Sequence, residues 1–141
     1  MPMMRYRKAA GCIVRNDGMI LLLRRSVNET SYHGLWELPG GKVEGEAVAG
    51  SLVFPAPEDT AITETVEETG ISKLIGTNIL LEPHIDHDME KVYYGYVVDV
   101  FGKTPNTTLS DEHDAFMWIT VEGALTIEPL SHHAHFLLSQ L

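Results

Sequence analysis

The chain has 141 residues, 44% of them hydrophobic, and its 20 acidic and 10 basic residues give a formal net charge of −10. This length is typical of one domain with a real core, so a single domain over residues 1–141 is expected. Such an acidic surface disfavours sequence-independent binding to duplex nucleic acid, which requires basic patches that displace counterions. No apolar run approaches the roughly 18 residues that cross a bilayer, which argues against a membrane protein.

The composition also bears on the compartment. The N-terminal segment carries charge but no apolar stretch behind it, so it does not have the pattern of a signal peptide. The one cysteine, Cys12, lies in an apolar run, and a single cysteine permits no intramolecular disulfide. A reducing compartment is therefore allowed, and we expect the protein in the cytoplasm.

The first part of the chain predicts a β-hairpin. Lys8 to Arg15 and Met19 to Arg24 are apolar runs, and Asn16-Asp17-Gly18 between them supplies turn residues. Arg25 follows at the end of the second strand. It is either solvated there or placed to meet an anionic ligand.

Two loops are predicted before the first helix. Pro39-Gly40-Gly41 forces a backbone bend with little side-chain cover, so main-chain groups there can approach a ligand or an ion directly. Residues 47–55 are mostly small and apolar and include a proline, and we interpret them as a loop. One use for this loop is as part of an interface. A homodimer is a possible assembly of the chain.

A short helix with an unusual acidic side is predicted to begin at Pro57 and to end at Gly70. Glu64, Glu67 and Glu68, at positions i, i+3 and i+4, lie on one side of it and repel one another. A divalent cation such as Mg²⁺ converts this repulsion into coordination, because hard ions take carboxylate oxygens. A solvated acidic face is the alternative, and the helix alone does not decide between them.

The second half of the chain predicts three strands, at Leu74 to Glu82, Lys91 to Phe101 and Ala115 to Thr120. A last helix is predicted to open at Glu128-Pro129, with its apolar residues at amphipathic spacing. Strands that alternate with two or three helices indicate an α/β or α+β sandwich.

Taken together, Leu35-Trp-Glu-Leu-Pro-Gly-Gly-Lys-Val-Glu44 and Glu64-Thr-Val-Glu-Glu-Thr-Gly-Ile71 resemble the Nudix hydrolase signature, and the flanking strands resemble its MutT-like branch. The resemblance covers most of the chain and implies an α/β/α sandwich with a mixed central sheet. The chain departs from the family pattern in two ways. Residues 47–55 look inserted within the signature, and Thr63 replaces an arginine that braces the helix glutamates in the family.

The resemblance also implies the metal ligands and the catalytic residues. Divalent ions would be bound by the Gly40 carbonyl, Glu64, Glu67 and Glu68. A further acid is expected six residues before Trp118, where Glu112 stands, with Asp111 and Asp114 as alternatives. The implied catalytic residues are Glu64, Glu67 and Glu112, and either Glu64 or Glu112 would be the general base.

The sequence also offers candidate substrate contacts. Arg25 and Lys42 are candidates to hold phosphate oxygens. Ser131 or His132, at the start of the last helix, occupies the neighbourhood that reads the base in the MutT-like branch. Trp36 and Tyr32 either stack on a base or pack in the core and loops.

The implied activity is Mg²⁺-dependent hydrolysis, with Mn²⁺ as a substitute, of a nucleoside diphosphate linked to another group. The leading substrate is a nucleoside triphosphate, cleaved to the monophosphate and pyrophosphate. ADP-ribose, a nucleotide sugar or a dinucleoside polyphosphate is the alternative. A rival from another class is a catalytically silent Nudix domain that binds a nucleotide or a protein. Thr63 and the insertion favour this rival, and the intact glutamate triad disfavours it.

Overall fold

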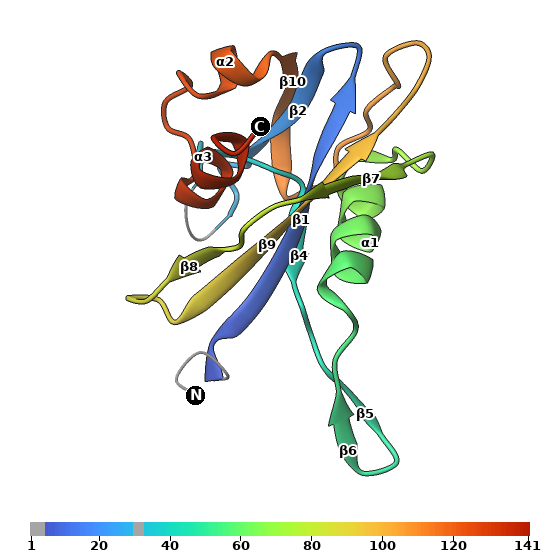
Figure 1. Cartoon of the computed structure of the whole chain (residues 1–141), viewed down its shortest axis with the longest axis vertical. Coiled ribbons are helices and arrows are strands. Elements are labelled where there is room, and N and C mark those ends of the chain that lie inside the picture. The colour runs from blue at the N-terminus through green and yellow to red at the C-terminus, as the bar shows by residue number, and fades with distance from the viewer. Residues whose placement is uncertain (1–4, 30–32) are drawn as a thin grey trace.

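The structure is a computed structural model that describes residues 5–29 and 33–141 (Figure 1). Tyr32, a predicted stacking residue, lies outside these ranges. In the described residues, eight strands form one sheet and two more form a separate hairpin. The strands of the large sheet are β1 (Arg7–Asn16), β2 (Met19–Arg25), β3 (Trp36–Glu37), β4 (Gly40–Lys42), β7 (Ile75–Leu80), β8 (His84–Asp86), β9 (Lys91–Asp99) and β10 (His113–Ile119).

The sheet is organised around β1. Its main order is β10-β2-β1-β9-β7, with β3 on β2, β4 on β1 and β8 on β9. The pairing of β1 with β9 is parallel and the other pairings are antiparallel. The predicted β1–β2 hairpin is confirmed, and its turn has positive φ at Asp17 (50°) and Gly18 (78°), the geometry that suits the strand twist.

Helices cover both faces of the sheet. Because side chains alternate along a strand, the even positions Ala10, Cys12 and Val14 of β1 face one core, whereas Ala9 and Ile13 face the other. Helix α1 (Pro57–Thr69) packs on the first core, and α2 (Val121–Ala124) and α3 (His132–Leu138) lie on the opposite side (Figure 1). The α/β/α sandwich with a mixed sheet is thus confirmed. None of the described helices is long and apolar enough to cross a bilayer.

Helix α1 has the predicted ends but a more polar buried side than expected. Pro57 begins it, and Gly70, at φ 72°, ends it with its N–H donating to the Val66 carbonyl. The buried residues of the helix are Thr60, Ala61, Thr65, Glu68 and Thr69. The core side of the helix therefore includes a glutamate.

Residues 47–55 differ from the predicted loop. They form most of a hairpin of β5 (Glu46–Val48) and β6 (Ser51–Val53), whose turn has positive φ at Ala49 (50°) and Gly50 (82°). The hairpin projects from the sandwich below α1 (Figure 1) and its residues are exposed. It remains a prediction that this hairpin is an insertion and that it contributes to an interface.

The C-terminal helix starts later in the chain than the sequence predicts. It begins at His132, because the Ser131 hydroxyl caps it by accepting a hydrogen bond from the Ala134 N–H at 3.2 Å. The short helix α2 and strand β8 were not predicted. Both are too short to give a periodic pattern in the sequence.

Candidate active site

The buried glutamate of α1 meets the glycine loop of β4. Glu68 is 2% exposed, and one of its carboxylate oxygens accepts a hydrogen bond from the Gly40 N–H at 2.8 Å. Gly40 lies opposite Gly11 in β1, which holds the loop against the sheet. The glycine bend and the acidic helix, which the sequence predicts separately, are therefore in direct contact.

The Glu64 side chain packs against Gly41, the residue after Gly40. A Cβ placed on Gly41 would lie 2.7 Å from the Glu64 carboxyl carbon, so a larger residue there would displace the Glu64 side chain. Glu64 is half-buried, and its pKa is raised by burial first and then by repulsion from Glu67, Glu112 and Glu44. The site thus concentrates negative charge.

Glu112 and His113 approach Glu68 from the start of β10. Ligand-capable atoms of Glu68, Glu112 and His113 all lie within 4.8 Å of one another, the one such group of three in residues 5–29 and 33–141. Burial and contact with Glu112 raise the pKa of Glu68 to about 10, and the Gly40 N–H opposes this increase. Without a cation, this shift favours the protonated form of Glu68 at neutral pH.

A chain of polar contacts extends from this group to Arg25. The His113 Nε2 atom lies 2.8 Å from the Glu37 carboxylate, and the Arg25 guanidinium lies 3.5 Å from the same oxygen. A second carboxylate, that of Glu29, lies 3.5 Å from Arg25. Arg25, predicted to hold phosphate, thus stands at the edge of the acidic group.

Sequence reasoning did not assign His113 and Glu37 to the site. His113 follows Glu112 and Glu37 precedes the glycine bend, but only the pairing of β2 with both β3 and β10 brings them together. The side chain of His113 is fully buried, and its Nδ1 atom has no hydrogen-bond partner within the described part of the chain.

The donor set fits a hard divalent cation. Two carboxylates and an imidazole nitrogen converge, and the proton on Glu68 is one that a cation can displace. Glu64 and Glu67 lie outside this compact group, although both carboxylates are on the same helix. Their role, and that of the Gly40 carbonyl, remain predictions.

The other predicted residues occupy different surroundings. Lys42 follows Gly41 on β4 and is exposed. The alternative acid Asp114 is paired with Arg24 at 2.8 Å, and Asp111 is exposed. The hydroxyl of Ser131 is used as the helix cap, whereas His132 is exposed.

The start of α3 is attached to β3. The Trp36 N–H donates to the Pro129 carbonyl and the Ser131 N–H donates to the Trp36 carbonyl, at 2.9 and 2.8 Å. Trp36 packs against the core and lies 5.8 Å from the Arg24 guanidinium. Because Trp36 directly precedes Glu37 in β3, these bonds place the predicted base-reading segment close to Glu37.

A histidine of α3 that the sequence did not single out is stacked in this region. His133 lies on the ring of Tyr93, with centroids 3.8 Å apart, and its Nε2 atom is 3.2 Å from the Ser131 hydroxyl. Burial is the main reason that the pKa of His133 falls to about 3, and the charge of Lys91 lowers it further. His133 is therefore neutral in the folded protein.

The fold and site agree with the comparisons to known proteins. The model of the NUDIX domain matches residues 5–138. The chain therefore belongs to the NUDIX domain family, as the sequence predicted.

Individual relatives are more specific. The chain is similar to the CTP pyrophosphohydrolase of Escherichia coli (strain K12), at 28% identity over 86% of this chain and 82% of that protein. It is also 26% identical to the nucleoside triphosphatase NudI of Enterobacter sp. (strain 638), over 89% of each chain. The crystal structure of the MutT protein from Methanosarcina mazei Go1 superposes with a TM-score of 0.69, at 30% identity over 96% of this chain and 91% of that one. The protein is thus a hydrolase of phosphorus-containing acid anhydrides, which confirms the predicted enzyme class.

Proposed function

We propose that the protein is a Mg²⁺-dependent pyrophosphohydrolase that converts a nucleoside triphosphate to the monophosphate and pyrophosphate. The observation that carries this proposal is the buried Glu68 carboxyl group, which accepts from the Gly40 N–H and lies beside Glu112 and His113. The named activities of the two curated relatives, on CTP and on nucleoside triphosphates, support the choice of substrate class.

The proposed metal ligands are Glu64, Glu67, Glu68, Glu112 and the Gly40 carbonyl, with His113 in contact with the group. When bound, Mg²⁺ neutralises the phosphate oxygens and lowers the pKa of a bound water. Mn²⁺ has the same ligand preference and is the expected substitute.

The residues of the chain then have separate tasks. A carboxylate accepts a proton from water as the water oxygen bonds to phosphorus, and the bond from phosphorus to the bridging oxygen breaks, so pyrophosphate leaves. We assign the base to Glu64, because burial and then repulsion from neighbouring carboxylates raise its pKa and so strengthen it as a base, with Glu112 as the alternative. Arg25 and Lys42 orient phosphate oxygens, and the segment around Ser131 and His132 contacts the base.

The test is a panel of nucleotides. Purified protein is incubated with the common ribo- and deoxyribonucleoside triphosphates, ADP-ribose, a nucleotide sugar and a dinucleoside polyphosphate, with Mg²⁺ or Mn²⁺. We expect monophosphate and pyrophosphate from at least one triphosphate. Release of orthophosphate instead contradicts the proposed cleavage position, and turnover of the conjugates alone favours the alternative substrates. No turnover with either metal favours a silent, nucleotide-binding domain.

A further inference from the structure

His113 is a buried histidine beside the acidic group, and the described part of the chain uses only one of its two ring nitrogens. Its Nε2 atom lies 2.8 Å from a Glu37 carboxylate oxygen, whereas its Nδ1 atom has no hydrogen-bond partner among residues 5–29 and 33–141. The side chain has no exposed surface, so bulk solvent does not satisfy this nitrogen. A buried polar atom without a partner is unfavourable and rare in folded proteins. A bound group is one way to supply the missing partner.

Cross-strand pairing turns His113 toward helix α1. Residues opposite each other on paired strands share one face of the sheet. His113 is opposite Arg25, and Trp118 is opposite Leu21. Leu21 and Trp118 pack in the core that α1 covers. Because side chains alternate along β2, Arg25 lies on the same face as Leu21, and His113 therefore lies on the α1 face as well.

A bulge in β10 determines that His113 is the residue on this face. The register of β10 with β2 shifts between His113 and Ala115, so Asp114 is an extra residue in the strand. In an unbroken strand, alternation from Trp118 would put Asp114 on the α1 face and His113 on the opposite one. The bulge reverses this order, and Asp114 instead pairs with Arg24 at 2.8 Å. Bulges redirect side chains next to active sites in this way.

Backbone hydrogen bonds fix the segment before His113 against α1. The Ser110 N–H donates to the Glu68 carbonyl at 3.4 Å, and the His113 N–H donates to the Ser110 carbonyl at 3.3 Å. The Ser26 N–H donates to the Glu112 carbonyl at 2.9 Å. A ring nitrogen of His113 and carboxylate oxygens of Glu68 and Glu112 all lie within 4.8 Å of one another. The fold thus holds the ring next to both carboxylates.

The contacts of His113 are those of a histidine that binds a metal ion. A histidine that coordinates through one nitrogen usually donates the N–H of the other to a carboxylate, which fixes the tautomer and orients the ring. Glu37 is that carboxylate here, and the Arg25 guanidinium lies 3.5 Å from the same oxygen. With Nε2 assigned as the donor to Glu37, Nδ1 keeps its lone pair for a cation.

We propose that His113 Nδ1 is a direct ligand of the divalent ion bound by Glu68 and Glu112, and that Glu37 positions the ring. This inference rests on the proposed function, because it concerns the same metal site. It also changes the expected choice of ion. Mg²⁺ prefers oxygen ligands, whereas an imidazole nitrogen suits ions such as Co²⁺ and Zn²⁺. The nitrogen should therefore strengthen the binding of Co²⁺ and Zn²⁺ much more than that of Mg²⁺.

The first test observes the nitrogen directly and needs no substitution. Zn²⁺, which is diamagnetic, is titrated into the nitrogen-15-labelled chain without a nucleotide, and long-range proton–nitrogen NMR spectra report both nitrogens of each histidine ring. Through-bond correlation to the assigned backbone identifies His113. We expect its Nδ1 signal to move to the range of a metal-bound nitrogen while Nε2 stays protonated. If Zn²⁺ binds and the His113 signals do not move, the inference is wrong.

The second test compares ions. Dissociation constants for Mg²⁺, Co²⁺ and Zn²⁺ are measured by calorimetry on the wild type and on His113→Gln, with no substrate present. Loss of the imidazole should weaken the binding of Co²⁺ and Zn²⁺ about 10- to 100-fold and that of Mg²⁺ by less than about threefold. Equal losses for all three ions would mean that the substitution only disturbs the carboxylates, which contradicts the inference.

His132→Gln is the matched control for this comparison. It repeats the chemical change at an exposed histidine of α3 and should leave the three dissociation constants unchanged. If His132→Gln instead weakens the binding of Co²⁺ and Zn²⁺ as His113→Gln does, these ions do not distinguish His113, and the assignment fails. The amide spectrum of each variant reports whether it is folded, and the Zn²⁺ titration of the wild type decides alone if His113→Gln does not fold.

Glu37 is tested as a positioning residue by two substitutions. Glutamine keeps an oxygen that accepts from Nε2, and alanine does not. Co²⁺ affinity should therefore fall about tenfold in Glu37→Ala and by less in Glu37→Gln. The visible absorption bands of bound Co²⁺ should be retained in Glu37→Gln and altered in His113→Gln, because only the second variant removes a ligand. Equal effects of the two Glu37 substitutions contradict the positioning role.

The metal measurements and the proposed hydrolysis fail separately. If no nucleotide is turned over but Zn²⁺ moves the His113 Nδ1 signal, the inference holds without the activity. If nucleotides are hydrolysed with Mg²⁺ and the His113 signals do not respond to Zn²⁺, the carboxylates act without the histidine and the inference is overturned. It is also overturned if the wild type binds none of the three ions.

Discussion

The carboxyl groups of Glu68 and Glu112 lie close to each other, one on the buried side of α1 and the other in the residue before β10. This contact, together with the burial of Glu68, raises the pKa of Glu68 from an ordinary value of 4.5 to about 10. Two like charges in a buried site are unfavourable, and a proton or a metal ion removes the conflict. The free energy of unfolding of the metal-free protein should therefore be sensitive to a substitution of Glu68.

The first prediction concerns Glu68→Gln. A carboxyl group whose folded-state pKa is raised supports folding fully below pH 4.5, and that support is lost as the pH rises toward 10. At pH 8 the metal-free variant should therefore exceed the wild type in free energy of unfolding by about 1–3 kcal/mol. Urea unfolding in a chelator, at several values between pH 5 and pH 9, measures the difference. A variant that is less stable at every pH contradicts the pKa shift.

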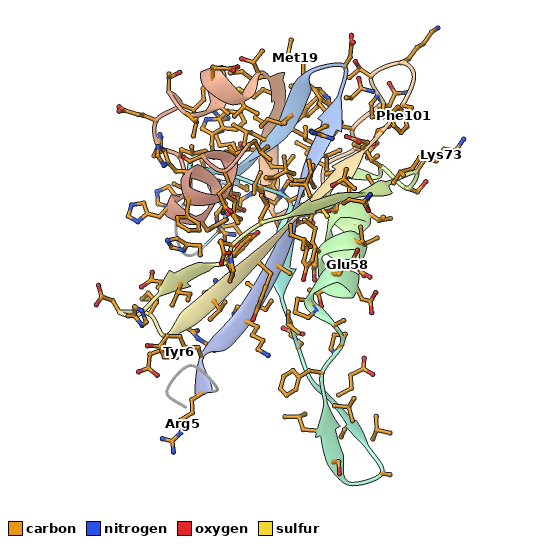
Figure 2. The ribbon with its side chains drawn as sticks, viewed as in Figure 1. Arg5, Tyr6, Met19, Glu58, Lys73 and Phe101 are labelled. Carbon is orange, nitrogen blue, oxygen red and sulfur yellow. The ribbon has the colours of Figure 1, made fainter. Side chains whose placement is uncertain are left out.

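The second prediction concerns Glu67→Gln, which should abolish metal-dependent hydrolysis and leave the fold intact. Glu67 is exposed, so the substitution disturbs no packing, but it removes a proposed metal ligand. Glu58→Gln is the matched control, because Glu58 is also exposed and lies on the first turn of the same helix (Figure 2). The initial rate of pyrophosphate release is the measurement. Unchanged turnover in Glu67→Gln rules out this ligand.

The third prediction contrasts two neighbouring glycines. A methyl group on Gly41 meets only the movable Glu64 carboxyl end, so Gly41→Ala should lower kcat about 10- to 100-fold with little loss of stability. A methyl group on Gly40 meets the Ala10 carbonyl and the Gly11 backbone, so Gly40→Ala should cost about 2–4 kcal/mol of stability. Thermal unfolding and initial rates, measured on both variants, separate the two effects. Equal stability loss in both would show that Glu64 does not lie as described.

The fourth prediction concerns the missing arginine. Thr63 is exposed and stands four residues before Glu67, the spacing at which an arginine and a glutamate pair on a helix. Thr63→Arg should therefore hold Glu67 in place and raise kcat/KM about two- to fivefold. Thr63→Gln, which adds length without charge, is the control. If neither the rate nor the metal affinity changes, the arginine is not needed in this chain.

The sequence predicted the parts of the site that are local and missed those that depend on distant pairing. Helix α1, the β1–β2 hairpin and the strand β9 follow from spacing and turn residues. The contact of Gly40 with Glu68 joins two segments that were each recognised, but its geometry needed the fold. His113 and Glu37 meet through tertiary pairing of three strands, and no local pattern marks either of them. The cavity lined by Arg5, Lys42, Phe54 and Lys91 could not be predicted either, because its residues come from four separate segments of the chain.

The last prediction concerns acid stability and His133. Burial and nearby charges, that of Lys91 foremost, lower its pKa from 6.5 to about 3. Between these values the unfolded chain takes up a proton that the folded protein does not, so the contribution of this group to stability is present above pH 6.5 and is lost as the pH falls. His133→Phe keeps a ring on Tyr93 and cannot titrate. Its stability relative to the wild type should thus improve by about 1–3 kcal/mol between pH 7.5 and pH 4.5.

Urea unfolding of both proteins at those two pH values gives this difference, and groups that titrate in both proteins cancel from it. His132→Phe, at the exposed neighbouring position, is the matched control and should show no such improvement. If the difference in free energy of unfolding between His133→Phe and the wild type is the same at both pH values, His133 accepts a proton in the folded state. The ring stacking of Tyr93 on His133 at 3.8 Å would then have to open in acid, which the aromatic NMR signals of Tyr93 would report.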